Sequence, residues 1–417
     1  MSEVETGAAN KPGAGSVGQS VVNTAEVPGI TIAGIRITYA TLLGRLPIFV
    51  GLIAIWIYFD SQTSGDYLSA RNISNAVQSY SFKPVLALGI VLVLLLGEID
   101  LSVGYMTALS AAICASFSYM NGWPAGVAIL ATVAICTLCG AAQGFLVAWL
   151  RMPSFVVTLG GFLIFEGVAN HTTGATAINV LDPFINSLGT TFIPDRWGFG
   201  IVAVASVLYV VFRLTARNAR VRSSGGASAD VLLFALSLIA PVAISMFAVW
   251  GLNQYRGVPY EFAILCASVA IFWFITTRMP YGRHLYAVGG NMEAARRAGI
   301  NTTFIRWSTF AISGCMAGIG GVLLLGYQPT ASTTLVSPDL LLDVISIAVI
   351  GGVSLTGGKG SVWSVLLGFL VVASVDSGLI LQATDPYMIS AVKGAILLIA
   401  IALDVVGKRL GVVTSKR

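Results

Sequence analysis

Charge is scarce in this sequence. Only 10% of its 417 residues are charged and 56% are hydrophobic, whereas an ordinary soluble domain carries about 25% charged residues. Such a chain cannot cover its surface with polar groups, so its outer surface must meet lipid. In lipid only helices and closed barrels satisfy every backbone hydrogen bond, and the long apolar runs described below favour helices. We therefore expect an all-α integral membrane protein, a polytopic helical bundle.

Metal and redox ligands are scarce as well. The chain has two histidines and five cysteines, and all five cysteines lie inside apolar runs. Only Cys136 and Cys139 are close together, and a metal or redox pair is the functional alternative for their C-x-x-C spacing. No further cysteine or histidine follows at ligand spacing. We interpret the cysteines as small packing residues and expect neither a metal nor another cofactor.

A phosphate-binding loop is missing too. Residues 351–360 look superficially like one, but a P-loop needs Gly, four residues, then Gly-Lys and Ser or Thr. Val353 stands at the position of the first glycine, and Gly360 follows Lys359. The apolar runs also contain no cluster of histidine, cysteine and carboxylate and no serine-based triad. These absences favour a protein that is not an enzyme and has no catalytic residues.

What the sequence does contain is a series of apolar runs, which predicts about twelve transmembrane spans. Residues 1–30 lack periodicity and predict a disordered cytoplasmic tail, and residues 31–417 form the transmembrane domain. Several runs are shorter than the about 20 residues that a bilayer needs. The runs are about Leu46–Phe59, Val85–Gly97, Leu101–Tyr119, Ala125–Leu150, Ser154–Ala169, Gly198–Phe212, Val231–Trp250, Val258–Ile275, Ile305–Leu325, Leu340–Leu355, Val362–Leu381 and Met388–Leu403.

Basic residues in the connections predict the orientation. If all twelve runs cross from a cytoplasmic N-terminus, 18 Lys and Arg residues lie inside, Lys393 lies in a span, and only four lie outside. Those four are Arg71, Lys83, Arg196 and Arg256. Cytoplasmic loops retain basic residues, so both termini are expected in the cytoplasm. Ten crossings with two re-entrant segments fit the same asymmetry. The net charge of +5 reflects this topology, and no nucleic-acid partner is expected.

Glycine is abundant, with 46 residues. It often recurs four residues apart inside a run, as in Gly140 and Gly144 or Gly314 and Gly318. Small residues at this spacing let helices approach closely, so we expect tight helix packing at these pairs.

Two glycine-containing segments, residues 97–104 and 351–360, interrupt the runs and predict discontinuous helices. Buried polar residues at broken helices often line a transport route. An ordinary turn in which Asp100 or Ser102 caps the next helix is the alternative, and the two roles are compatible. The candidates for a translocation path are Glu98, Asp100, Ser102, Ser354 and Thr356.

Residues 278–303 form the longest cytoplasmic connection with helix-forming content. Asn291 can cap a short helix over Met292–Ala298, which Gly299 ends. That helix would carry small alanines on one side and charges on the other, which suits docking into a groove on a partner. A solvated loop that merely retains positive charge inside is the alternative.

Four motifs stand in order along the chain. They are Gly-Glu-Ile-Asp-Leu-Ser-Val-Gly at 97–104, Met-Pro-Ser-Phe-Val-Val-Thr-Leu-Gly-Gly at 152–161, Gly-Arg-His-Leu-Tyr-Ala-Val-Gly-Gly-Asn-Met-Glu-Ala-Ala-Arg-Arg-Ala-Gly-Ile-Asn at 282–301 and Ile-Gly-Gly-Val-Ser-Leu-Thr-Gly-Gly-Lys-Gly-Ser at 350–361. Their combination resembles the permeases of bacterial ABC importers for monosaccharides, with ribose and xylose permeases nearest. The resemblance extends from about residue 70 to the C-terminus, and the enlarged region from about 215 to 260 is more similar to xylose permeases.

The resemblance implies a permease subunit that moves a monosaccharide, such as the pentose D-xylose, across the bacterial inner membrane. It implies a separate cytoplasmic ATPase, an extracytoplasmic sugar-binding protein and a permease homodimer in membrane lipid. It also implies that the segment from Gly289 to Gly299, within the coupling loop 278–303, touches the ATPase, although Arg297 departs from the small polar residue or leucine usual there. The matched coupling residues are Gly289, Gly290, Asn291, Glu293, Ala294, Ala295 and Gly299.

Two other functions fit parts of the sequence. A proton-coupled secondary sugar transporter is the main rival, because four ionisable residues in or beside spans could form a relay. They are Glu98, Asp100, Glu166 and Lys393. This reading accounts for the charges but not for the docking segment. The same type of importer for ribose or another small solute is the second alternative.

Overall fold

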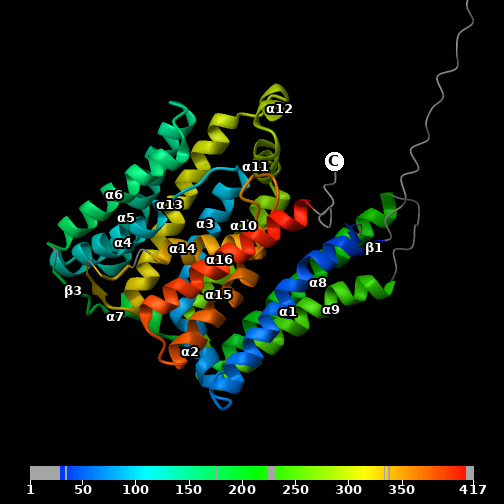
Figure 1. The fold of residues 1–417 in the computed structure, drawn as a ribbon, viewed down its shortest axis with the longest axis horizontal. Coiled ribbons are helices and arrows are strands. Elements are labelled where there is room, and N and C mark those ends of the chain that lie inside the picture. Colours follow the sequence, from blue (N-terminus) through cyan, green and yellow to red (C-terminus); the bar gives the residue numbers. More distant parts are fainter. Residues whose placement is uncertain are drawn as a thin grey trace, which may run out of the picture.

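The chain folds into a bundle of helices (Figure 1). The computed structural model describes residues 29–409 except 33–34, 175, 224–230, 333 and 337–338. The predicted tail, residues 1–30, lies outside the described residues apart from its last two. The elements are β1 Gly29–Ile32, β2 Ile35–Thr38, α1 Tyr39–Gln62, α2 Ala70–Tyr80, α3 Phe82–Leu95, α4 Val103–Ala115, the π-helical turn η1 Ser116–Met120, α5 Ala125–Ala148, α6 Ser154–Thr172, β3 Ile178–Asn179, α7 Pro183–Thr190, β4 Phe192–Ile193, α8 Asp195–Ser223, α9 Val231–Asn253, β5 Val258–Pro259, α10 Tyr260–Arg278, α11 Pro280–Gly290, α12 Met292–Arg297, α13 Thr302–Tyr327, β6 Thr330–Ala331, α14 Asp339–Ile350, α15 Ser364–Leu381 and α16 Pro386–Arg409.

The architecture confirms an all-α polytopic membrane protein. Within the described residues eight helices are long and apolar enough to cross a bilayer, or up to nine if the bent pair α2 and α3 forms one broken span. Helices α1 and α16 add the shorter apolar stretches Ile48–Gln62 and Pro386–Ala402. Helix α14 has 12 residues, about 18 Å of helix, against a hydrocarbon core of about 30 Å. Each predicted run falls on a helix, but the count of twelve crossings is not confirmed.

Helix α3 lies at the centre of the bundle. All of its residues from Phe82 to Leu95 are buried, as expected of a helix that is hydrophobic all round. It packs against α13 and α14 and also contacts α10 and α15. A bend of 48° separates it from α2, so the chain changes direction just before it enters the core.

Helices α5 and α13 approach each other through glycines. A Cβ atom on Gly140 would lie 2.4 Å from the carbonyl oxygen of Phe310 and 3.0 Å from the Cα of Gly314. A Cβ atom on Gly318 would lie 3.1 Å from the Cβ of Cys136. There is no room for side chains at these positions, so the predicted tight packing at the glycine pairs is confirmed. Cys136 is one of the residues packed in this contact.

The two ends of the bundle carry different structures. One end has α7 and two short antiparallel pairs, in which β3 pairs with β6 and β4 with β5. The other end has α11 and α12 (Figure 1). Helix α13 spans the distance between the two ends. It begins shortly after α12 in the chain, and its last turn contacts α7, where a Cβ on Gly189 would lie 2.1 Å from the nitrogen of Tyr327. Its 26 residues extend about 39 Å.

Three of the four basic residues predicted to be external lie at or near the end that carries the short strand pairs. Arg196 lies in the first turn of α8, next to β4, and Arg256 lies just before β5. Arg71 lies in the first turn of α2, which contacts β5. Lys83 is the exception: its prediction as an external basic residue is wrong, since it is 8% exposed inside α3. Two buried carboxylates provide the charge that retains it there, as described below.

Candidate translocation path and coupling site

The first interruption contains two carboxylates in different environments. Glu98 pairs with Arg306 of α13, with Arg306 Nε 2.9 Å from Glu98 Oε1 and both side chains 14% exposed. Asp100 is 2% exposed and accepts hydrogen bonds from the backbone nitrogen of Ser102 at 2.9 Å and from the hydroxyl of Ser313 at 2.8 Å. Among the described residues, therefore, Glu98 has a cationic partner and Asp100 has none.

Ser102 belongs to the same polar group and links it to α5. Its hydroxyl lies 2.7 Å from Asp100 Oδ1 and 3.1 Å from Gln143 Oε1. Ser102 is the residue that precedes α4, but its side chain makes no capping hydrogen bond. Ser102 therefore does not cap α4 with its side chain, and the buried carboxylate of Asp100 accepts the Ser102 backbone N–H in the turn between α3 and α4.

The second interruption is a glycine-rich loop closed on itself. Gly352, Gly357, Gly358 and Gly360 have positive φ angles of 98°, 83°, 69° and 147°, which favour glycine. The hydroxyls of Ser354 and Thr356 lie 2.9 Å apart, and the backbone nitrogen of Ser354 donates to the carbonyl of Lys359 at 2.9 Å. These bonds hold the two predicted path residues of this loop side by side.

The two interruptions meet each other and the end of α11. A Cβ on Gly289 would lie 1.8 Å from the carbonyl oxygen of Leu95, and one on Gly357 would lie 2.7 Å from the Gly289 carbonyl and 2.8 Å from the Gly97 nitrogen. The Gly358 nitrogen donates to the Leu95 carbonyl at 2.9 Å. We call this backbone contact the glycine junction. It consists of Gly97, Gly289, Gly357 and Gly358.

Helix α11 was not predicted, since residues 278–290 were expected to form a loop. It begins with Pro280 at its N-terminus, where the missing N–H has no cost, and buries Gly282, Leu285 and Val288 on one face. The hydroxyl of Tyr286 donates to the carbonyl of Gly360 at 3.0 Å. Helix α11 is therefore attached to the second interruption by a side chain as well as by the glycine junction.

The short helix α12 forms as the sequence predicts. The side chain of Asn291 accepts from the backbone nitrogen of Ala294 at 2.9 Å. Gly299 ends the turn with φ +82°, and Ile300 donates its backbone N–H to the carbonyl of Ala295. The helix closes at Arg297, one residue before the predicted end.

The predicted alanine face of α12 is divided between two environments. Ala295 is 5% exposed and belongs to the chain's own hydrophobic core, whereas Ala294 is exposed. The expectation that both alanines face a partner is therefore wrong for Ala295. Glu293 is exposed and pairs within the helix, at 3.1 Å with Arg296 and 3.2 Å with Arg297.

The structure brings four buried charged residues together in a cluster that the sequence does not predict. Lys83 lies 2.6 Å from both Asp343 of α14 and Asp376 of α15, and Lys393 of α16 lies 3.0 Å and 3.1 Å from the same two carboxylates. We call Lys83, Asp343, Asp376 and Lys393 the charge cluster. Two cations balance two anions, and the ring of Tyr80 lies 4.7 Å from the Lys83 ammonium. Asp343 and Asp376 inside apolar runs were the signal that could have revealed it.

The four residues proposed for a proton relay are not gathered in one site. Glu98 pairs with Arg306, Asp100 is held by hydroxyl groups, and Lys393 belongs to the charge cluster. Glu166 of α6 interacts with the hydroxyl of Tyr105. Glu98 and Asp100 both bond to α13 from the α3–α4 connection, whereas Glu166 and Lys393 have partners on other helices, so within the described residues the four groups do not form one continuous chain.

Comparisons with known proteins all identify transport permeases as the similar proteins. The family model described as "Branched-chain amino acid transport system / permease component" matches residues 72–401. The chain is 36% identical over 368 residues to the xylose transport system permease protein XylH of Escherichia coli (strain K12), covering 88% of this chain and 93% of that protein. It is 35% identical over 371 residues to XylH of Haemophilus influenzae, covering 88% and 98%. It is 28% identical over 379 residues to the ribose import permease protein RbsC of Escherichia coli (strain K12), covering 90% and 98%. No solved structure matches.

Proposed function

Because the chain belongs to the family of branched-chain amino acid transport system permease components, we propose that it is the membrane-spanning permease of an ATP-driven importer that carries a monosaccharide, with D-xylose the first candidate. The observation that carries this proposal is the 36% identity to a xylose permease over 93% of that protein's length. The lower identity of 28% to a ribose permease makes ribose the second candidate.

A permease component is a transport subunit and not an enzyme. In this family it works in the membrane with an ATPase and a substrate-binding protein. We place ATP hydrolysis in the separate cytoplasmic ATPase and sugar capture in the extracytoplasmic binding protein. We further propose that two copies of this chain form the translocation unit in the inner membrane.

The proposed orientation puts α11, α12 and both termini in the cytoplasm. It is supported by Arg283, Arg296 and Arg297, which belong to the α11–α12 end and are exposed, because basic residues are retained inside. A reporter inserted between residues 278 and 301 should read cytoplasmic, while one after Pro183 or Arg256 should read external. The reverse pattern would reject the orientation.

Helices α11 and α12 are the proposed contact with the ATPase. Ala294 and Glu293 are exposed on α12, and the α11 end is packed backbone to backbone against both interruptions. A push on these helices would therefore reach the segments before α4 and after α14 directly. The glycine junction supports a coupling role for Gly289, whereas Gly290, the last residue of α11, has open space where a Cβ would lie and would act only through its place in the chain between Gly289 and α12. Asn291 and Gly299 would act by fixing the ends of α12.

The interruptions themselves are the proposed mobile lining of the path. The Asp100 carboxylate is held by uncharged donors of Ser102 and Ser313, and Ser354 and Thr356 lie on a loop beside Gly97. Arg306 would position Glu98, and this pair would hold the α3–α4 turn against α13. Neutral hydroxyl groups suit a polyhydroxylated solute, because they both donate and accept hydrogen bonds.

Uptake in cells tests the proposed substrate. The chain would be expressed with the ATPase and binding protein of its own organism in cells that lack sugar importers, and radiolabelled D-xylose, D-ribose, D-fructose and L-leucine would be supplied. Uptake of D-xylose above the other three is expected. Uptake of leucine and of no sugar would reject the proposal, and uptake of D-ribose alone would replace the substrate but keep the function.

A further inference from the structure

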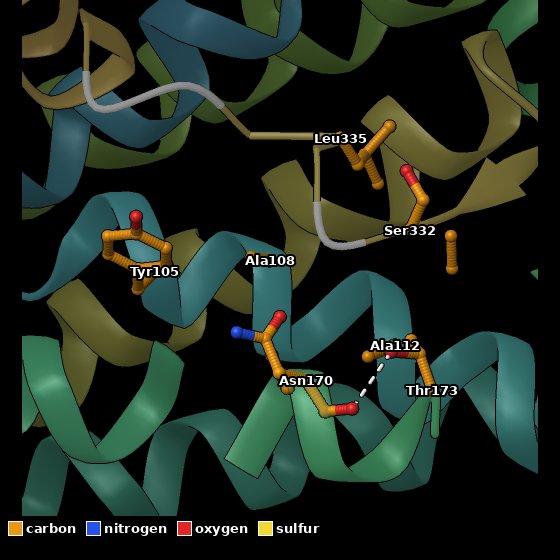
Figure 2. Close-up of a pocket in the computed structure, with 9 residues that line it drawn as sticks. Tyr105, Ala108, Ala112, Asn170, Thr173, Ser332 and Leu335 are labelled. Carbon is orange, nitrogen blue, oxygen red and sulfur yellow. Dashed lines mark hydrogen bonds between the residues drawn. The ribbon is translucent and has the colours of Figure 1, made fainter. Parts of the chain in front are cut away.

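A small cavity lies between α4, α6 and the chain that follows β6. Figure 2 shows side chains from these three segments around the same space, with Tyr105 from α4, Asn170 and Thr173 from the end of α6, and Ser332 after β6. The rest of the wall includes four alanines, whose small side chains leave the space open. They are Ala108, Ala112, Ala169 and Ala331. None of the five predicted path residues lines this cavity.

The cavity lies toward the end of the bundle opposite α12. Ala331 belongs to β6, whose partner β3 lies at that end, and Asn170 lies in the last turn of α6. In the proposed orientation this end faces the binding protein, so the cavity lies where a released sugar would first meet the permease.

The polar groups of the cavity are neutral. They comprise a phenol hydroxyl, a primary amide and the hydroxyls of Thr173 and Ser332, and among the described residues no Lys, Arg, Asp or Glu lines the space. Thr173 uses its hydroxyl to donate to the backbone carbonyl of Asn170 at 3.1 Å. The side-chain amide of Asn170 bonds no other group within the part of the chain that the structure describes, so it is free for a ligand.

The ring of Tyr105 is fixed by an aromatic contact. It meets the ring of Phe162 edge to face, with centroids 4.4 Å apart. An aromatic ring fixed beside a free amide and a hydroxyl is the arrangement that recognises a neutral hydroxylated molecule, because the amide both donates and accepts. A zwitterionic amino acid would instead need a cation and an anion in the wall.

We propose that this cavity is the entry site for the monosaccharide, with Asn170, Tyr105 and Ser332 as its hydrogen-bonding groups. This inference rests on the proposed sugar-import function. In the present conformation the space is about that of one water molecule. Sugar binding therefore requires Asn170 and Thr173 at the end of α6 to move apart from Ser332, and the polar groups then become available together.

The test uses the full transporter in proteoliposomes, with its ATPase and binding protein, and the sugar that the wild type carries. The variants are Asn170→Leu, Tyr105→Phe and Ser332→Ala. The control is Thr172→Val, because the Thr172 hydroxyl donates to its own helix at Val168 and does not line the cavity. The readouts are sugar moved per ATP hydrolysed and the ratio of D-xylose to D-ribose uptake.

We expect each variant to lower the sugar moved per ATP by roughly three- to tenfold, the effect of one neutral hydrogen bond, and Asn170→Leu to change the sugar ratio. Tyr105→Phe removes a single oxygen and so reports even if Asn170→Leu fails to fold. Values for Tyr105→Phe and Ser332→Ala equal to those of Thr172→Val, in a wild type that imports sugar, would overturn the cavity but not the proposed function. A wild type that imports no sugar would overturn both.

Discussion

The charge cluster and the glycine junction both fasten helices together, by opposite means. In the cluster, four charged side chains from α3, α14, α15 and α16 meet at 2.6 to 3.1 Å. At the junction no side chains intervene, and the backbones of three segments touch, with the Gly358 nitrogen 2.9 Å from the Leu95 carbonyl oxygen. One contact depends on charge balance and the other on close backbone packing with a backbone hydrogen bond.

The difference teaches where this protein is fixed and where it can move. Buried charges must stay with their partners, since an unpaired one is expensive inside a membrane protein. The cluster therefore holds the four helices at one separation. A glycine contact carries no such penalty for small shifts, but it tolerates no added atoms. The junction is thus the better place for a displacement to pass between α11 and the interruptions.

Breaking the cluster should have the largest effect. Lys83→Met leaves two buried carboxylates with one cation, and removal of one partner from a buried pair costs about 3–5 kcal/mol. We expect a severe loss of folded protein, measured as monodisperse protein recovered from the membrane and as its melting temperature.

A second substitution sharpens this prediction. Lys83→Met with Asp376→Leu removes one charge of each sign and leaves Lys393 paired with Asp343 at 3.0 Å. Replacing buried ions by apolar groups of similar size is often neutral, so the double variant should recover most of the folded protein. Recovery no better than in the single variant would contradict the view that charge balance is what matters.

The two neighbouring alanines of α12 separate folding from coupling. Ala295→Arg forces a charged side chain into the core and should destabilise the protein by about 1–3 kcal/mol from overpacking alone. Ala294→Arg points outward and should change stability by no more than about 0.5 kcal/mol, yet abolish most sugar uptake by blocking the ATPase contact. Melting temperature, uptake and co-purification of the ATPase would be measured. Full uptake and full ATPase retention in Ala294→Arg would show that α12 is not the contact.

Removing the surface charge of α12 should have the smallest effect. Glu293→Gln breaks pairs with Arg296 and Arg297 whose side chains are 52% to 79% exposed, and such pairs contribute about 0–1 kcal/mol. The melting temperature should therefore hardly change. The change should be even smaller at high salt, because salt screens exposed charges. A fall in melting temperature as large as that of Lys83→Met would contradict the assignment of Glu293 to surface pairs alone.

Local features of this fold could be predicted from the sequence, and long-range ones could not. Asn291 and Gly299 act on residues three or four positions away, so the cap and stop of α12 were read correctly. Lys83 follows the break before α3, and only the fold places Asp343 and Asp376 beside it, so a rule based on loops assigned it outside. Ala295 likewise needed the tertiary contact of α12 with the core to be distinguished from Ala294.

Two adjacent glycines of α11 allow the most direct test of the coupling account. Gly289→Ala would place a Cβ 1.8 Å from the Leu95 carbonyl oxygen, whereas a Cβ on Gly290 meets nothing within 4 Å. The measurement is sugar imported per ATP hydrolysed by the reconstituted transporter, at equal amounts of assembled complex. We predict a clear fall for Gly289→Ala and a wild-type ratio for Gly290→Ala. Wild-type ratios in both variants would contradict the claim that the glycine junction transmits the action of the ATPase to the path.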